Sequence, residues 1–318
     1  MSTYVLIENI LQGLTAGILV GSIYALMCVG LGLIFGVMRV INFAQGEFLM
    51  LGMYGTLYAY SWLAFERFLG PYVGPIVGAL IAAVVLYVVG LFLHRWLLVR
   101  VTGIRVAGSE SEGHYPQLIL TLGLSLIIAN AGLIFFGSTP QNIRTPLSAS
   151  AWEIPVVGDN VAVFLNKARS VAFFVSVAVA IVLYLFITRT RIGKMLRAAA
   201  DNPEAALYMG IDVERAHRIA FGLGCAITAL AGGLVATYYP FQPYAGLDFV
   251  IIMYAGVVLG GMGSIGGAFW GGLTIGLVQQ LSTLVLPTQL QNTAIFVVFL
   301  LIMMLRPEGL FGRNVERA

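Results

Sequence analysis

Charged residues are scarce in this chain, and their scarcity limits the classes of protein it can belong to. Of its 318 residues, 10% are charged and 59% are hydrophobic, and the mean hydropathy is +0.94. A soluble domain carries about 25% charged residues, because it must cover its surface with groups that water can solvate. The composition therefore excludes a soluble globular domain and predicts a chain whose solvent is largely lipid.

Residues that enzymes and metal sites need are also few. The only two lysines, Lys167 and Lys194, stand outside any GxxxxGK[ST] pattern of the kind that cradles nucleotide phosphates. The three histidines fall at the ends of apolar runs or in loops, without an HExxH pattern or a His/Cys cluster at metal-ligand spacing. The two cysteines, Cys28 and Cys225, lie in apolar runs and are typical of small buried hydrophobes. We therefore predict no catalytic residue, no metal site and no cofactor bound by this chain.

Long continuous apolar runs are what the chain has instead, and they predict membrane-spanning helices. A β-barrel would show short segments of alternating hydrophobicity, whereas a helical span needs about 20 apolar residues. The candidate spans are residues 10–37, 43–65, 72–93, 116–137, 170–188, 219–239, 249–262, 266–286 and 290–305. The seventh is short and is joined to the eighth by a glycine run, so the pair is either two spans or a broken, partly re-entrant segment. We predict an all-α membrane protein, a polytopic bundle of about eight or nine transmembrane helices in one domain over residues 1–318.

The loops between these spans differ in basic charge, and this difference predicts the orientation. If the N-terminus lies outside, only Arg67, Arg144, Lys167 and Arg169 are external, and the other 13 of the 17 basic residues are internal. Cytoplasmic loops carry the excess of Lys and Arg. We therefore predict an external N-terminus, a cytoplasmic C-terminus and an odd number of spans.

Two loops are long enough to have a role of their own. The external loop 138–169 is expected to form an ordered cap or a short hairpin. In the inner loop 189–218, Asn202 followed by Pro203 is a strong helix start, and Gly210 is a plausible stop. We expect this short helix to carry exposed apolar residues, so docking against a partner is favoured over an ordinary solvated loop.

The most polar stretch inside the apolar sequence surrounds Glu47. A buried ionisable group is costly and is by default a functional hypothesis. We expect Arg39 to neutralise it, the amides of Asn42 and Gln45 to bond freed backbone groups, and Gly46 to allow a turn or a close helix approach. The segment is either a helix break that lines or gates a solute path, or a polar hinge that only connects the first two spans.

A glycine-rich run over residues 256–272 has two interpretations. Small residues let helices approach closely in lipid, which explains most of these glycines. A broken helix that lines the solute path is the alternative, because discontinuous helices cluster at substrate sites. Its gate candidates are Gly263, Ser264 and Gly266.

Four segments carry a resemblance to a known family. They read RVINFAQGE at 39–47, RAAADNPEAA at 197–206 with Gly210, GGMGSIGG at 260–267, and RPEGLFG at 306–312. With them the chain resembles, over essentially its whole length, the membrane permeases of branched-chain amino acid ABC transporters, of the LivH type. The inner loop is similar to the one through which ABC permeases contact their ATPases, although the Ile-x-Leu-Pro part of that pattern is absent. The coupling residues that the resemblance implies are Arg197, Asp201, Asn202, Pro203, Glu204, Ala205, Ala206 and Gly210.

The resemblance also implies a bacterial inner-membrane location and a set of partners. These are a second permease of the LivH or LivM type, two cytoplasmic ATPase subunits that hold ATP and Mg, and a periplasmic solute-binding protein; nucleic acid is not expected. The solute is most simply a branched-chain or related hydrophobic amino acid, although similar permeases serve urea, short amides and aromatic acids. The alternatives are a stand-alone ion-coupled secondary transporter built around Glu47, and a membrane scaffold without a solute path.

Overall fold

The computed structural model describes residues 3–62, 69–102, 114–156, 162–306 and 308–312. Helices form most of this part of the chain, together with one two-stranded sheet. In chain order the elements are α1 (Thr3–Met38), α2 (Gln45–Trp62), α4 (Gly70–Leu93), η1 (His94–Leu98), α5 (Val99–Thr102), α6 (His114–Phe136), β1 (Ala151–Pro155), β2 (Ala162–Asn166), α7 (Lys167–Arg189), α8 (Arg191–Asp201), α9 (Pro203–Tyr208), α10 (Val213–Val235), α11 (Ala245–Gly260), α12 (Ile265–Ser282), η3 (Thr288–Leu290) and α13 (Gln291–Leu305).

Each of the nine predicted apolar segments folds mainly as a helix where the structure describes it. The end of the second, 63–65, lies outside the described residues. Six helices within the described residues are long and apolar enough to cross a bilayer; they include α1, α4 with η1, α6, α7, α10, and α13 with η3. Helix α11, at 16 residues, is shorter. The predicted count of eight or nine crossings is therefore not confirmed, while a mostly helical membrane architecture is.

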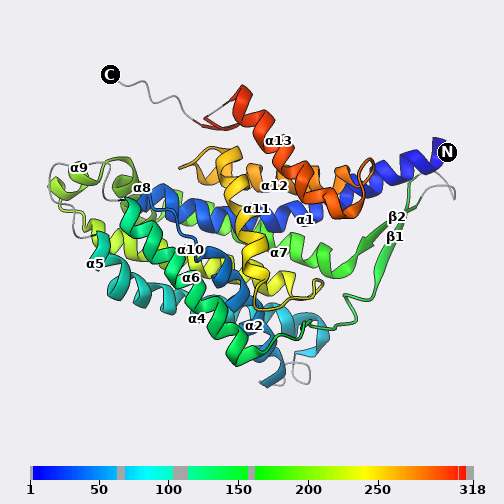
Figure 1. Ribbon diagram of the computed structural model, residues 1–318, viewed down its shortest axis with the longest axis horizontal. Helices are drawn as coiled ribbons and strands as arrows, with labels where there is room; N and C mark the ends of the chain where they lie inside the picture. Colours follow the sequence, from blue (N-terminus) through cyan, green and yellow to red (C-terminus); the bar gives the residue numbers. More distant parts are fainter. Residues whose placement is uncertain (1–2, 63–68, 103–113, 157–161, 307, 313–318) are drawn as a thin grey trace.

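The centre of the molecule is built on α10 and on the second half of α1, which are largely buried, whereas Ile295 is the one buried residue of α13. Helix α1 runs beside α12 along the long axis of the molecule, as Figure 1 shows. Their axes come close because small residues meet: a Cβ placed on Gly272 would lie 2.5 Å from the Cα of Ala25. Helix α10 packs against α1, α2 and α4. In lipid the hydrophobic effect does not drive helices together, so close packing of this kind is what stabilises their association.

The two long loops lie at opposite ends of the molecule (Figure 1). In the loop 138–169, β1 and β2 pair antiparallel with Ala151 opposite Asn166, so the expected short hairpin is confirmed. Asn166 then begins α7, because its side chain accepts a hydrogen bond from the Arg169 backbone N–H. Helices α8 and α9 occupy the other end. This separation agrees with loops that face opposite sides of a membrane.

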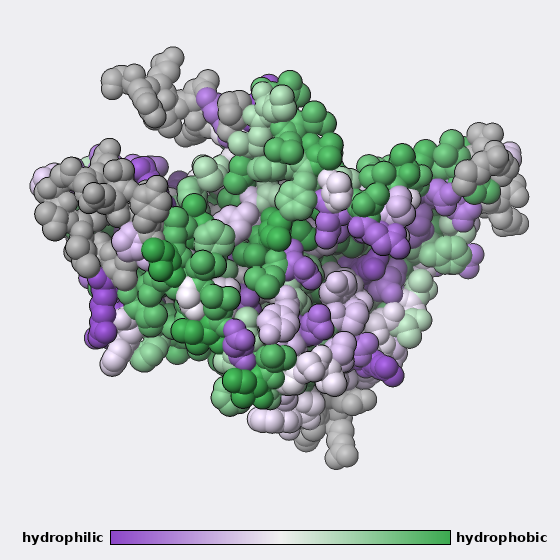
Figure 2. All heavy atoms as spheres, viewed as in Figure 1, coloured by the Kyte–Doolittle hydropathy of each residue, from purple (hydrophilic) through white to green (hydrophobic). Residues whose placement is uncertain are grey.

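The surface of the bundle is mostly apolar. Large hydrophobic side chains are exposed along α4, α6, α7 and α13, as expected for lipid-facing helices. On the face shown in Figure 2, hydrophilic residues gather beside the starts of α7 and α13 and at the α8–α9 end, with apolar surface between them. That pattern is typical of a protein that crosses a membrane with polar groups at its two ends.

Candidate functional site

A cavity of about 460 Å³ lies where the predicted helix break, the glycine turn and the inner loop meet. We call it the Arg39 cavity. Its lining comes from the end of α1, the start of α6, the end of α8 and the turn between α11 and α12. The residues that line it are Phe35, Gly36, Arg39, Val40, Ile41, Gln117, Leu118, Ala200, Asp201, Met262 and Gly263. Segments from distant parts of the sequence, treated separately in the sequence analysis, thus share one cavity.

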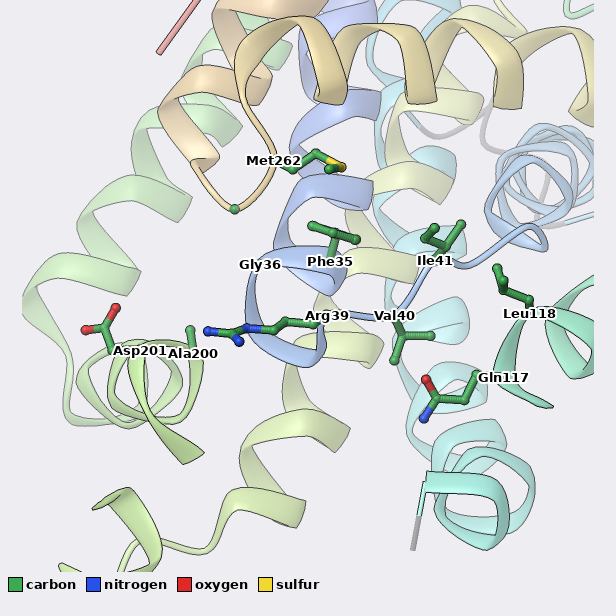
Figure 3. Close-up of a pocket in the computed structure, with 11 residues that line it drawn as sticks. Phe35, Gly36, Arg39, Val40, Ile41, Gln117, Leu118, Ala200, Asp201 and Met262 are labelled. Atoms are coloured by element: carbon green, nitrogen blue, oxygen red, sulfur yellow. The ribbon is translucent and has the colours of Figure 1, made fainter. Parts of the chain in front are cut away.

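Arg39 is the cationic residue among those that line this cavity. Figure 3 shows its guanidinium extending across the cavity toward Ala200 and Asp201 of α8. Its φ of 54° is positive, which is uncommon for a residue other than glycine and marks a position held by its surroundings. The expected pairing of Arg39 with Glu47 is not what the described residues show, because the Glu47 carboxylate accepts a hydrogen bond from the Ser125 hydroxyl at 3.3 Å instead.

The break between α1 and α2 is confirmed, and buried amides hold it. The side-chain N–H of Asn42 donates to the Gln45 side-chain oxygen at 3.0 Å, and the Asn42 oxygen accepts from the Ala44 backbone N–H at 3.2 Å. The Gln45 amide donates to the Gly224 carbonyl at 3.2 Å and to the Thr228 hydroxyl, both on α10. Because a broken helix frees backbone groups that lipid cannot solvate, these amides do the bonding that the sequence predicted for them.

Gly46 and Glu47 lie at the start of α2, where it meets the start of α11. A Cβ on Gly46 would collide with the Gly246 carbonyl, so the two backbones are in direct contact. Glu47 is 1% exposed, and its second carboxylate oxygen has no hydrogen-bond partner within the described residues. These gate candidates are therefore buried next to the break, and they lie behind the cavity rather than on its wall.

The glycine turn between α11 and α12 supplies the other gate candidates. Gly261 and Gly263 have positive φ values of 97° and 94°, which let the chain reverse within four residues. Gly263 lines the Arg39 cavity. Ser264 caps α12 by accepting a hydrogen bond from the Gly267 N–H at 3.0 Å, and Gly266 is exposed. The segment is thus a tight turn between two packed helices, with one of its predicted residues in the cavity.

The inner loop holds two helices, α8 and α9, and α9 is the short helix predicted between Asn202 and Gly210. The predicted start is confirmed, since the Asn202 side chain accepts from the Ala205 N–H at 3.0 Å and Pro203 opens α9. α9 ends at Tyr208, and Gly210 has a φ of 78°. The break at Asn202 arises because proline cannot continue the preceding helix.

The coupling candidates lie almost entirely on the surface of this end. Arg197, Asp201, Asn202, Glu204, Ala205 and Gly210 are exposed, and Ala206 is buried. The tip of α9 exposes apolar side chains: Leu207 is 59%, Tyr208 89% and Met209 81% exposed. No described residue covers this tip, so it is available to a partner.

Sequence reasoning missed helix α8, which carries one wall of the cavity. Thr190 starts it by accepting a hydrogen bond from the Gly193 N–H at 3.0 Å. Its buried face consists of Gly193, Leu196 and Ala199. The signal was present in the sequence as a threonine followed by apolar residues at a spacing of three, the pattern of a capped amphipathic helix.

Comparison with known proteins agrees with this architecture. Residues 13–305 match the family model described as "Branched-chain amino acid transport system / permease component". The high-affinity branched-chain amino acid transport system permease protein LivH of Escherichia coli K12 is 30% identical over 96% of this chain and 97% of its own length. The permease protein BraD of Pseudomonas aeruginosa is 30% identical over 98% of this chain and 99% of its own length. The fructose import permease protein FrcC of Rhizobium meliloti matches 51% of this chain at 31% identity. The chain therefore belongs to the family of permease components of branched-chain amino acid transport systems.

Proposed function

We propose that this protein is the membrane-spanning permease subunit of an ATP-driven importer for branched-chain or related hydrophobic amino acids in a bacterial inner membrane. It forms one permease domain over residues 1–318, with its N-terminus outside and its C-terminus in the cytoplasm. The names of the full-length relatives support the solute class, and the predominance of basic residues on one side supports the orientation.

The partners follow from what one permease chain lacks. A second permease of the LivH or LivM type completes the solute path, and a periplasmic binding protein delivers solute to the hairpin end. Two cytoplasmic ATPase subunits hold ATP and Mg, because this sequence has no phosphate-cradling loop of its own. The permease is not an enzyme; it couples two conformations of the path to the nucleotide state of its partners.

The observation that carries the proposal is the position of α8 and α9. The exposed apolar tip of α9 is a suitable contact for an ATPase, and α8, joined to α9 through Asn202, forms a wall of the Arg39 cavity. A push on α9 therefore reaches the helix break and the glycine turn through a single intervening helix. We propose that ATP-driven closure of the ATPase pair moves α8 and opens or closes the solute path at this cavity.

Co-purification tests the proposal. The tagged full-length chain is purified in detergent from its native host, with the variant Glu204→Arg in parallel, and the proteins that come with it are identified by mass spectrometry. We expect an ATPase and a second permease with the wild type, and loss of the ATPase alone with the variant. If the chain is isolated alone and transports amino acid in liposomes under an ion gradient, with loss of transport in Glu47→Gln, it is an ion-coupled carrier instead.

A further inference from the structure

A second cavity, of about 470 Å³, lies near the other end of the molecule, between α1, α7, α10, α11 and α12 and the start of α13. We call it the Arg169 cavity, after the arginine in the first turn of α7. Polar groups on its wall include Arg169, Asp248, Tyr24, Tyr238, Gln279 and Asn292. None of these residues was among the candidates from the sequence, and the comparisons assign no role to them.

Opposite charges face this one cavity without neutralising each other. Within the described part of the chain, neither Arg169 nor Asp248 forms an ion pair. Arg169 is held by other means: its guanidinium lies 5.4 Å from the centre of the Tyr238 ring, and its backbone is fixed by the Asn166 cap. Asp248 stands in the first turn of α11. A cavity lined by one cation and one anion is suited to a ligand that carries both charges.

Neutral hydrogen bonds fix the remaining polar wall. The Tyr24 hydroxyl donates to the Gln279 side-chain oxygen at 2.9 Å, and the Gln279 amide donates to the Asn292 oxygen at 3.3 Å. These bonds join α1, α12 and α13 and hold the amides in one orientation. The wall is therefore built before a ligand arrives, which reduces the entropy lost on binding.

A small apolar pocket adjoins the Arg169 cavity and shares Asp248, Ile252 and Asn292 with it. We call it the apolar annex. Its other residues are Ile251, Ala255, Ile295 and Phe296. Its volume of about 50 Å³ has room for about four water-sized groups, which is close to the size of a short branched alkyl chain. A polar cavity with charges of both signs therefore opens onto a site for a small aliphatic group.

We propose that the Arg169 cavity and its annex form a binding site for a zwitterionic α-amino acid with a short branched side chain. Arg169 receives the carboxylate, Asp248 receives the ammonium group, and the annex takes the side chain. This inference rests on the proposed function and adds to it a location, a charge requirement and a limit on side-chain size. Charge-assisted hydrogen bonds give the site its selectivity for the zwitterion, and the annex gives its selectivity among zwitterions.

Uptake by the whole transporter in its native membrane tests the site. Variants are returned to a host strain that lacks the gene, and uptake of radiolabelled L-leucine is measured at equal amounts of protein in the membrane. We expect Arg169→Gln and Asp248→Asn each to raise the half-saturating concentration about ten- to a hundredfold, as expected for the loss of a hydrogen bond to a charged group. Phe296→Ala, which widens the annex, should increase uptake of L-phenylalanine relative to L-leucine.

Two control variants remove one positive and one negative charge at positions away from the proposed site. Arg100→Gln and Glu8→Gln lie outside both cavities and their annex, and we expect wild-type uptake from both. Wild-type leucine kinetics in Arg169→Gln and Asp248→Asn would overturn the inference, and so would equal losses in the matched variants.

Ligand binding by the purified full chain separates failure of this site from failure of the proposed function. L-leucine should raise the thermal unfolding temperature of the wild type, whereas L-leucinamide and 4-methylpentanoate, which each lack one of the two charges, should raise it less. Leucine stabilisation that is lost in Arg169→Gln supports the site even if deletion of the gene leaves leucine uptake unchanged, a result that would overturn the importer alone. Equal stabilisation by all three compounds overturns the site while leaving the importer intact.

Discussion

At the scale of single residues, the polar segment between α1 and α2 contains both buried and exposed side chains, and the two groups have different roles. Asn42, Gln45 and Glu47 are buried and bond to α6, α10 and each other, and the two amides bond backbone groups at a break that would otherwise leave them unsatisfied. Arg39 is exposed and reaches into a cavity. The buried groups therefore set the geometry, and the arginine is free to respond when the cavity changes shape.

The contact between Gly46 and Gly246 gives a stability prediction. In Gly46→Ala the new methyl group would collide with the Gly246 carbonyl, and we expect α2 and α11 to separate at a cost of about 1–3 kcal/mol. Thermal unfolding of the purified protein in detergent measures this loss. Gly123→Ala is the matched control, because Gly123 lies within α6 with nothing within 4 Å of its Cβ position; it should leave stability equal or slightly raised. Equal stability of the two variants would contradict the predicted contact.

Charge complementarity across the Arg39 cavity gives a second prediction. Because Arg39 points toward Asp201 on α8, we expect Arg39→Glu and Asp201→Arg each to reduce solute uptake by like-charge repulsion within the cavity. The double variant Arg39→Glu/Asp201→Arg should restore most of it. Uptake in the deletion host measures all three.

The control for the charge exchange pairs Arg39→Glu with Glu8→Arg, since Glu8 lies in α1 and lines neither cavity. This pair exchanges the same charges without facing each other, so it should not recover uptake. Recovery there, or no recovery in the Arg39/Asp201 pair, would show that the two cavity residues act separately.

At the scale of elements, α9 is a helix too short to be stable by itself. It has six residues, far fewer than an isolated helix needs in water. Its start is held by Asn202 and Pro203, while its exposed tip is apolar. Its order therefore depends on its cap and on α8, and its apolar tip gives it the character of a contact surface.

Removing the cap should weaken the proposed contact with an ATPase without unfolding the bundle. In Asn202→Ala the Ala205 N–H loses its side-chain acceptor, at a cost of about 0.5–2 kcal/mol to the helix. We expect less ATPase to co-purify, with an unchanged unfolding temperature for the permease. Asn166→Ala removes the equivalent cap from α7 at the opposite end, and it should retain the ATPase. A full complement of ATPase with Asn202→Ala would exclude α9 as the dock.

Much of the element pattern could be predicted because lipid makes apolar length a strong signal. The cap at Asn202, the break before Gln45 and the hairpin followed from local chemistry that needs no tertiary context. Pairing across elements could not be predicted: sequence placed Arg39 against Glu47, which is nearby in the chain, whereas in the fold Arg39 extends toward α8. The Arg169 cavity was missed for the same reason, because its charges come from separate helices.

At the scale of the whole molecule, α1 connects the two cavities. Tyr24 lies on the wall of the Arg169 cavity and Phe35 on the wall of the Arg39 cavity, which places them about 16 Å apart along the helix at 1.5 Å per residue. All residues of α1 between them, 25–34, are buried. Within this chain the two cavities are therefore separated by packed helices. A solute path through both would require α1 to move relative to its neighbours, or the proposed second permease to supply the connection.

One labelling experiment can measure both the orientation of the chain in the membrane and whether the number of membrane crossings is odd or even. The native Cys28 and Cys225 are 0% exposed, so cysteines introduced singly at exposed positions should react with a membrane-impermeant maleimide over little background. Tyr4→Cys lies at the start of α1, and Phe311→Cys follows α13. Because basic residues collect on the cytoplasmic side, we expect Tyr4→Cys to react in intact cells and Phe311→Cys only after permeabilisation. Opposite sides for the two ends require an odd number of crossings, whereas the same side for both would require an even number, as expected if α11 and α12 together made a single broken crossing.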